Sequence, residues 1–215
     1  MKTLLFDFDG VLIKNNKIEK IIEEKSIEYV SRKLKNHSDP KKLNRSFYKK
    51  YGHTAIGLKH FLHKENNNID NYAELVLDYN QFVFSNIDFN DIKKYINKND
   101  IVHINNLLSI SGNYYSNVGI FTNAPSTWCE NICKLIDIDI YEHIDDNLLF
   151  TSDEGLSKPL CNTYNNVENY VSNDILFIDD SISNLMPVIN RNKWTVYLQN
   201  NFYKENLYTF LLNEN

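Results

Sequence analysis

The sequence predicts an α/β fold in which a Rossmann-like parallel sheet core carries an inserted α-helical cap domain. Segments with helical spacing, around 128–136 and 160–171, separate the expected strands, and Pro125 and Pro159 stand where a first helical turn tolerates proline. This alternation is typical of a parallel sheet with crossover connections. Five short apolar runs rich in β-branched or aromatic residues indicate the buried strands: Thr3 to Phe8, Val118 to Thr122, Leu148 to Thr151, Ile175 to Ile178 and Trp194 to Leu198.

A long insertion interrupts the alternation after the first strand. From residue 15 to residue 103 the apolar positions follow the helical period without a convincing strand pattern, so we expect a helical cap there and assign 1–14 and 104–215 to the core. A last helix is expected at about 101–111, with Asp100 capping its start and Gly112 closing its end. Two apolar stripes predict cap helices that pack together: Ile18, Ile21, Ile22, Tyr29, Val30 and Leu34 in one, and Tyr72, Leu75, Val76, Tyr79 and Val83 in the other.

The composition favours a protein that acts on small molecules inside the cell. The 215 residues include 42% hydrophobic ones, enough for a sizeable core, and the formal net charge of −5 gives no reason to bind nucleic acid or a membrane. The start MKTLLFDFDG lacks the pattern of a signal peptide, and no apolar stretch approaches the roughly 20 residues that span a bilayer. Cys129, Cys133 and Cys161 have neither metal-site spacing nor a disulfide framework. We expect a cytoplasmic protein, and its oligomeric state stays open.

Polar residues gather where the expected strands end, which is the edge at which an open parallel sheet binds ligands. Carboxylates at Asp7, Asp9 and Asp180 would repel one another there, which predicts a hard divalent cation with oxygen ligands, and Mg²⁺ is the natural candidate. A lysine would add positive charge, and a neutral hydroxyl and amide could donate hydrogen bonds to phosphoryl oxygens. The candidates are Asp7 and Asp9 after the first strand, Thr122 and Asn123 after the second, Lys158 after the third, and Asp179 and Asp180 after the fourth.

These residues stand in the motifs DFDGVL, FTNAP, GLSKP and FIDDSISN, whose order resembles the haloacid dehalogenase (HAD) superfamily of phosphatases over the whole core. The resemblance implies a HAD-like fold, a cap inserted between the first two motifs, and attack by Asp7 to form an aspartyl-phosphate. It implies that Asp9 protonates the leaving oxygen and then activates water. The remaining implied roles are Mg²⁺ ligation by Asp7, the backbone carbonyl of Asp9 and Asp180, phosphoryl binding by Thr122, Asn123 and Lys158, and support of the metal site by Asp179 and Asn184.

Read singly, several of these residues have ordinary explanations. Asn123 could form a turn before Pro125, and Lys158 could be a solvated surface lysine. Asp179 could equally cap a helix that begins near Ser181. Their joint placement on successive α/β units favours the phosphatase hypothesis.

Two related chemistries and one silent alternative compete with a phosphatase. Dehalogenases of the superfamily lack the second acid of the first motif, because a halide leaves without a proton, whereas Asp9 is present here. A phosphoaccepting receiver domain has its acidic pair first and its lysine last, the reverse of the order of Asp179 and Lys158. A scaffold of the same fold without turnover stays open, since fold alone does not prove activity.

The cap should decide the substrate, because the core recognises only phosphate. The runs FYKKYGHTAIGLKHFL and FVFSNIDFNDI, with the TNAP and DDSxxN variants of the core motifs, resemble the pyrimidine 5'-nucleotidase branch. This implies a nucleoside monophosphate such as UMP or CMP as the substrate, with Tyr51, His53 and Thr54 near the nucleoside. A turn between two cap helices would explain Gly52 equally well.

The first motif departs from that branch. It has Gly10 and Val11 where the nucleotidases usually have an Asn-Thr pair, and Gly-Val recurs in sugar-phosphate and phosphoglycolate phosphatases. One of those monoesters is therefore the alternative substrate.

Charged and metal-binding residue types elsewhere have simpler interpretations. His53, His60 and His63 lack the context of a zinc motif and are expected in cap packing or on the surface. A basic stretch is interpreted as a solvated helix face because the whole chain is acidic, and its members are Lys41, Lys42, Arg45, Lys49 and Lys50.

Overall fold

The core is a five-stranded parallel sheet with the strand order β3-β2-β1-β4-β5. The computed structural model describes residues 2–35, 37–63, 72–145, 147–155, 157–199 and 204–213. The predicted α/β fold with a parallel sheet is confirmed, and the five expected strands occur with small shifts at their ends. Their bounds are Thr3–Phe6 for β1, Asn117–Phe121 for β2, Leu149–Phe150 for β3, Ile175–Asp179 for β4 and Trp194–Leu198 for β5.

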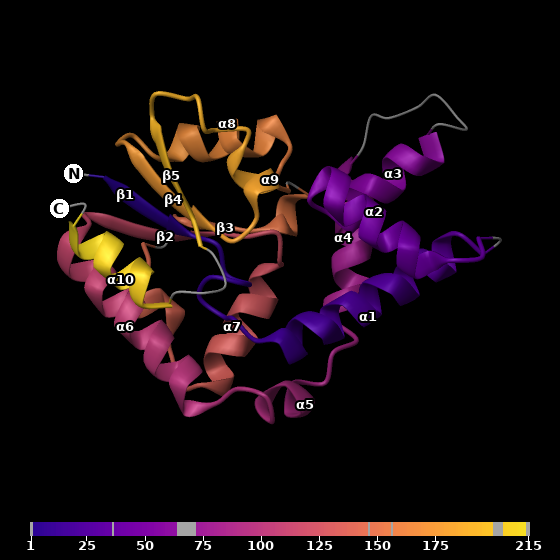
Figure 1. Cartoon of the computed structure of the whole chain (residues 1–215), viewed down its shortest axis with the longest axis horizontal. Coiled ribbons are helices and arrows are strands. Elements are labelled where there is room, and N and C mark those ends of the chain that lie inside the picture. The colour runs from indigo at the N-terminus through magenta and orange to yellow at the C-terminus, as the bar shows by residue number, and fades with distance from the viewer. Residues whose placement is uncertain are drawn as a thin grey trace.

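Helices cover both faces of this sheet (Figure 1). Successive side chains of β1 point to opposite faces, so Leu4 and Phe6 belong to the same buried cluster as Leu107 of α6 (Lys98–Tyr114), while Leu5 belongs to the cluster of Tyr164 of α8 (Cys161–Tyr170). Both faces of β1 are fully buried, which explains its continuous apolar run. The elements beyond the second strand are α7 Ser126–Leu135, the 3₁₀ turns η1 Ile140–Glu142 and η2 Ser152–Glu154, α8 Cys161–Tyr170, α9 Ile182–Leu185 and α10 Lys204–Asn213.

The described part of the chain between β1 and β2 contains helices and no strand. Four of these helices stand beside the core at the right of Figure 1, where α1 packs on α2 and α4, and α3 packs on the same two helices. Tyr29 of α1 meets Tyr79 of α4 edge to face with ring centroids 5.3 Å apart. The segment comprises α1 Asn16–Lys33, α2 Pro40–Tyr51, α3 Thr54–His63, α4 Tyr72–Phe84, α5 Phe89–Lys93 and α6 Lys98–Tyr114. The division of core and cap at residues 15 and 103 stays a prediction, and α6 runs across the second of these positions.

Helix α6 differs from its prediction at both ends. Its N-cap is Asn97, whose side chain accepts hydrogen bonds from two backbone amides. In return, the side chain of Asp100, the third helical residue, accepts a hydrogen bond from the Asn97 backbone amide at 3.0 Å. Asp100 is thus one half of a capping box and not the cap itself. Gly112 lies inside the helix, which continues to Tyr114. The prediction of both ends was wrong because either residue type also fits a position one turn inside a helix.

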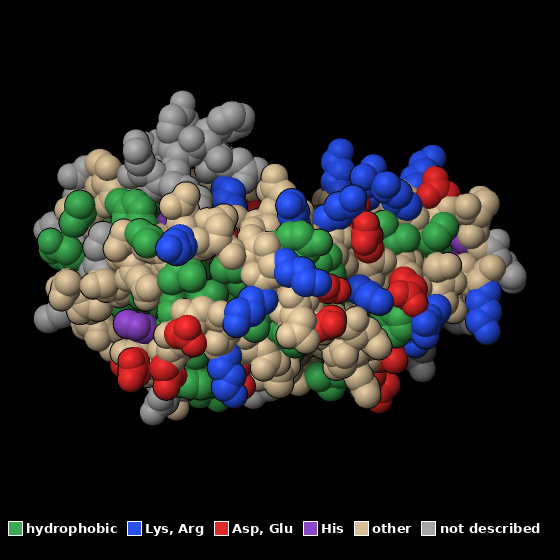
Figure 2. Space-filling model, turned by 90° about the horizontal axis from the view of Figure 1, so that it is seen from below, with side chains coloured by type: hydrophobic (Ala, Val, Ile, Leu, Met, Phe, Trp, Pro, Cys, Tyr) green, Lys and Arg blue, Asp and Glu red, His purple; other side chains and the backbone are tan. Residues whose placement is uncertain are grey.

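The surface of the cap carries charges of both signs. Figure 2 shows Lys and Arg side chains interspersed with Asp and Glu over the half of the molecule that contains α1–α4. The basic residues of α2 are exposed, and Arg45 forms an ion pair with Glu23 at 3.2 Å. In the described part of the chain, no helix combines the length and apolarity needed to cross a bilayer.

Candidate active site

Functional side chains converge where β1, β2 and β4 end. Because these strands are parallel neighbours, their carboxyl ends lie at one edge of the sheet. Asp7 follows β1, Thr122 follows β2, Asp179 is the last residue of β4 and Asp180 comes next. Carboxylate oxygens of Asp7, Asp179 and Asp180 lie within 4.8 Å of one another. Residues far apart in sequence therefore meet at one small site.

Lys158 is fully buried at the centre of this cluster. Its ammonium lies 2.6 Å from Asp179 Oδ2 and 3.2 Å from Asp7 Oδ1, and it donates a hydrogen bond to the backbone oxygen of Phe121 at 2.7 Å. Burial alone would lower the pKa of Lys158, but the charges of Asp179 and Asp7 outweigh it and raise that pKa. The interpretation of Lys158 as a solvated surface residue is therefore wrong.

Both carboxylate oxygens of Asp179 are occupied by hydrogen bonds from neighbouring residues. Both of its carboxylate oxygens accept hydrogen bonds from the Asn184 amide nitrogen at 3.1 Å, and Oδ1 also accepts from the backbone of Ser181 at 2.8 Å. Together with Lys158 these donors occupy most of its lone pairs. Asp179 was alternatively expected to cap a helix that begins near Ser181. It does accept a hydrogen bond from the backbone amide of Ser181, the residue before α9.

Asp7 and Asp180 keep oxygens that no described protein group binds. Burial first, and then the charge of Asp179, raises the pKa of Asp7 well above its usual range. The same two causes raise the pKa of Asp180 to about 6. The Asn184 side-chain oxygen, also at this cavity, is buried without a hydrogen-bond partner among the described residues. Several acceptors that repel one another and lack donors fit a hard divalent cation, so the residues present are suited to Mg²⁺.

Asp9 is held by a tryptophan of α7. Its Oδ1 accepts a hydrogen bond from the indole nitrogen of Trp128 at 3.1 Å. Burial is the main cause that raises the pKa of Asp9 to about 7; the indole bond opposes the shift and the charge of Asp180 adds to it. A carboxyl group with a pKa near neutrality can both give and take a proton, as a general acid and base must.

The loop after β2 contributes the Thr122 hydroxyl to the site and, through Asn123, hydrogen bonds to the backbone of Lys158. Thr122 Oγ1 accepts a hydrogen bond from the backbone of Ala124 at 3.2 Å, which leaves its own hydroxyl proton for a ligand. Asn123 has a role that the sequence did not predict, because its side chain bonds both the backbone amide and the backbone oxygen of Lys158, at 2.7 and 3.0 Å. It ties two site loops together, and its binding of a phosphoryl group stays a prediction.

Two glycines allow parts of the site to approach closely. Gly10 has φ +88°, and a Cβ there would lie 2.3 Å from Asp180 Oδ2. Gly52 ends α2 with φ +68°, which confirms the predicted turn, and a Cβ there would lie 2.8 Å from Pro159 Cδ. Only glycine combines these backbone angles with such contacts. Gly52 therefore also serves the contact between the cap helices and the core.

A cavity of about 610 Å³ lies between the strand ends and the helices α1–α4. Asp7, Asp9 and Asp180 line its floor, and the buried polar groups of the opposite wall are neutral and form hydrogen-bonded pairs. Tyr79 Oη lies 2.7 Å from Ser26 Oγ, and Thr54 Oγ1 donates to the Asn44 side-chain oxygen at 2.7 Å. Asn44 is 4% exposed as a residue and lines the cavity, and since its amide oxygen accepts from Thr54, its amide nitrogen is available to donate to a ligand. This wall is suited to a neutral, polar ligand.

The cap residues expected near a substrate divide into two groups. His53 and Thr54 line the cavity. Burial lowers the pKa of His53 to about 4, and its Nδ1 accepts from the Ala55 amide at 3.2 Å, so the ring is neutral with its proton on Nε2. Tyr51 is not among the lining residues; its ring stacks on His60 with centroids 4.4 Å apart. The expectation of cap packing holds for His60.

Sequence reasoning missed three residues of this site. Asn44 and Tyr48 line the cavity from α2, one turn apart, inside the stretch interpreted as a basic helix face. Tyr48 is 55% exposed as a residue, and burial of its hydroxyl end together with the carboxylates of Asp180 and Asp7 raises the pKa of the phenol. Trp128 was assigned only to a helix. Their polar or aromatic character at helical spacing was a signal, but only the direction of each helix gave it meaning.

Comparison with known proteins supports the fold. Neither a family model nor a curated protein sequence matches this chain. Among solved structures, the crystal structure of a HAD family enzyme from Bacteroides thetaiotaomicron aligns with a TM-score of 0.51 at 17% identity, covering 93% of this chain and 94% of the other. The chain thus has the fold of HAD family enzymes, as its four motifs predicted. Its likeness to the pyrimidine 5'-nucleotidase branch stays a prediction.

Proposed function

We propose that this protein is a Mg²⁺-dependent phosphatase that hydrolyses a small phosphate monoester through a phosphorylated Asp7. One observation carries the proposal: the buried Asp7 carboxylate is ion-paired through Oδ1 with Lys158 at 3.2 Å and faces an open cavity beside Asp9 and Thr122. A nucleophile, a cation, a proton-transferring acid and a hydroxyl donor are the groups that phosphoryl transfer requires. The likeness to a HAD family enzyme supports this hydrolase assignment.

The proposed reaction has two half-reactions. A free oxygen of Asp7 attacks phosphorus and forms an O–P bond while the bond from phosphorus to the leaving oxygen breaks, and Asp9 gives its proton to that oxygen. Water then attacks the same phosphorus, Asp9 takes up the water proton, and the bond to Asp7 breaks, releasing inorganic phosphate. The pKa of Asp9 at about 7 makes both of its forms accessible near neutral pH.

The remaining side chains hold the transferred group. Lys158 stays charged and balances the phosphoryl oxygens beside Asp7, and the Thr122 hydroxyl donates a hydrogen bond to them. Asp7, Asp180 and the backbone oxygen of Asp9 would hold Mg²⁺, which supplies charge neutralisation of the phosphate when bound. Asp179 and Asn184 keep Lys158 and the acids in place.

The substrate we propose is a pyrimidine nucleoside 5'-monophosphate. Asn44 lines the cavity and its amide oxygen accepts from Thr54, so its amide nitrogen is available to donate to a base carbonyl or a ribose oxygen of a substrate. Phosphoglycolate fits less well, because its carboxylate would need a cation; the basic side chains that line the cavity, Lys20, Arg45 and Lys49, are exposed. The cavity volume lies in the usual range for small-molecule sites.

The other expectations about partners and location belong to the same proposal. The chain is acidic overall, and charges of both signs alternate on its cap, which favours a small phosphorylated metabolite over nucleic acid or a membrane surface. All three cysteines are free, in keeping with a reducing, cytoplasmic setting.

A phosphate-release screen tests the proposal. Purified protein is incubated with Mg²⁺ and, in parallel, with excess chelator, over UMP, CMP, purine nucleoside monophosphates, sugar phosphates and phosphoglycolate. We expect Mg²⁺-dependent release with the highest kcat/KM for UMP or CMP. A sugar phosphate as best substrate would keep the reaction and replace the substrate, whereas no release from any monoester would refute the phosphatase and favour a silent scaffold.

A further inference from the structure

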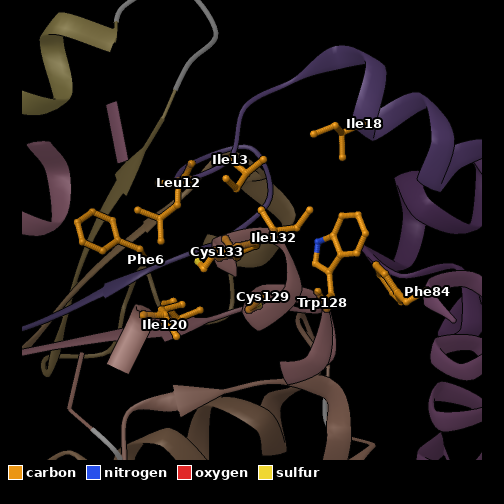
Figure 3. Close-up of a cluster of buried hydrophobic side chains, with 14 of the residues drawn as sticks. Phe6, Leu12, Ile13, Ile18, Phe84, Ile120, Trp128, Cys129, Ile132 and Cys133 are labelled. Carbon is orange, nitrogen blue, oxygen red and sulfur yellow. The ribbon is translucent and has the colours of Figure 1, made fainter. Parts of the chain in front are cut away.

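Trp128 connects the proton-transferring acid of the core with the aromatic residues of the cap. It lies in the first turn of α7 and is only 1% exposed. Its ring packs against Phe84 at the end of α4 and against Phe89 at the start of α5, with centroid distances of 5.3 and 5.7 Å. In Figure 3 the indole nitrogen faces away from Phe84. That nitrogen donates the hydrogen bond to Asp9 Oδ1 at 3.1 Å.

The Asp9 carboxylate depends on this contact for its orientation. Among the described residues, Trp128 is the one side chain that donates a hydrogen bond to it. The bond occupies Oδ1 and leaves Oδ2 for the proton that is exchanged with the substrate. A catalytic group that is free to rotate loses the alignment on which proton transfer depends, whereas the buried Trp128 indole is held by its packing on Phe84 and Phe89.

We propose that Trp128 is a positioning residue, which holds the Asp9 carboxylate at the angle from which Oδ2 reaches the leaving oxygen of the substrate. The inference rests on the proposed phosphatase function. Phe84 and Phe89 pack on the indole from the cap side. The indole therefore connects the packing of the cap on α7 with the orientation of Asp9 in the core. Trp128 itself does not touch the reacting atoms.

A second tryptophan provides a matched control. Trp194 in β5 is also buried, packs between aromatic rings and donates from its indole nitrogen to a carboxylate, Glu168 Oε1, at 2.6 Å. It does not line the cavity. Trp128→Phe and Trp194→Phe each remove one indole donor to a carboxylate and keep an aromatic ring, so they differ chiefly in which acid loses its donor.

The leaving group of the substrate separates positioning from mere packing. A nucleoside or alkyl leaving oxygen must be protonated by Asp9, whereas p-nitrophenolate leaves without a proton. We expect Trp128→Phe to lower kcat/KM for the best natural-type monoester by about 10- to 100-fold, and for p-nitrophenyl phosphate by less than about 3-fold. Asp9→Asn should show the same preference more strongly, Phe84→Leu more weakly, and Trp194→Phe not at all.

Fluorescence shows the contact independently of turnover. In Trp194→Phe protein the remaining tryptophan is Trp128, and replacing Asp9 by Ala should shift its emission, whereas Asp91→Ala on the exposed surface should not. An unchanged emission with Asp9→Ala, or equal losses of kcat/KM for both kinds of leaving group in Trp128→Phe, would overturn the inference alone. If the emission shifts but the wild-type protein hydrolyses neither a phosphate monoester from the screen nor p-nitrophenyl phosphate, the proposed function is refuted, and the positioning role of Trp128 with it.

Discussion

The two walls of the cavity are built by opposite principles. The core wall concentrates charge: Lys158 is fully buried between two carboxylates, and the neighbouring acids have raised pKa values because burial and mutual repulsion disfavour their charged forms. The buried side chains of the cap wall are neutral, among them Asn44, His53 and Tyr79, while the basic residues that line the cavity from the cap are exposed. The core wall suits chemistry on a charged group, and the cap wall suits selection of a neutral one.

This difference predicts how substitutions should behave. Charges in a low-dielectric site act strongly and depend on one another, so changes in the core wall should abolish turnover or destabilise the fold. Single neutral hydrogen bonds contribute about 0.5–1.5 kcal/mol each, so changes in the cap wall should give graded effects on substrate preference. Substitutions on each wall therefore test this difference between the core and the cap.

The largest effect is expected for Asp7→Asn, which removes the attacking carboxylate with little change in volume. Turnover should fall by about 10⁴-fold or more, while the circular dichroism spectrum stays unchanged. Asp91→Asn, on the exposed surface of α5, is the control and should keep full activity. Substantial phosphate release by Asp7→Asn would exclude Asp7 as the nucleophile.

Lys158→Met should be nearly as severe in activity and also costly in stability. It leaves the carboxylates of Asp7 and Asp179 buried without their cation, and breaking a buried ion pair typically costs about 3–5 kcal/mol. Urea unfolding measures this loss, and phosphate release measures turnover. Lys59→Met is the matched control, because Lys59 is also buried, in α3 over the ring of Tyr72, yet lies outside the cavity. Equal stability of the two variants would contradict a special role for the core ion pairs.

Asn44→Ala should act on substrate preference. We expect KM for the best nucleotide to rise by about 5- to 10-fold, the equivalent of one lost hydrogen bond, with a smaller change for p-nitrophenyl phosphate. Tyr51→Leu is the comparison, because Tyr51 stacks on His60 outside the cavity and should leave KM unchanged. A larger effect of Tyr51→Leu than of Asn44→Ala would return the substrate contact to the residue that the sequence suggested.

The smallest effect expected is a pH-dependent stabilisation by Mg²⁺. The raised pKa values of Asp9, about 7, and Asp180, about 6, mean that the folded protein binds protons that the unfolded chain releases. Without metal, these two groups therefore lower the stability of the fold as pH rises from their ordinary pKa, about 4, to their raised pKa values of about 6 and 7. Mg²⁺ favours the deprotonated carboxylates, so it should raise Tm more at about pH 7.5 than at about pH 5.5.

His53 contributes with the opposite sign, since burial lowers its pKa to about 4. The contribution of His53 is the same with and without Mg²⁺. It therefore drops out of the difference in Tm between the two conditions. Scanning calorimetry on wild type and Asp180→Asn measures that difference. The same Mg²⁺ shift at both pH values, or a full pH dependence in Asp180→Asn, would contradict the cation site.

The elements that sequence reasoning found are those with a strong local signal. The fully buried strands β1 and β4 are built mainly of apolar residues, and acids stand at their ends, since Asp7 follows β1 and Asp179 closes β4. The ends of α6 were misjudged because Asp100 and Gly112 fit a cap and an interior position almost equally well. Lys158 shows the same ambiguity for a side chain, since nothing in a lysine's neighbours along the chain tells whether its ammonium is solvated or paired.

The sequence alone determined the order of the strands along the chain, the residues that follow each strand and the helical character of the long insertion, because these depend on local spacing and apolar runs. Only the tertiary structure decided that Asn44 and Tyr48 face the acids while Tyr51 does not, that Asn123 ties down the backbone of Lys158, and that Trp128 reaches Asp9. Each of these contacts depends on how a helix or loop is rotated against a distant partner. That rotation follows from packing across the whole core, to which the residues next to each position contribute only a small part.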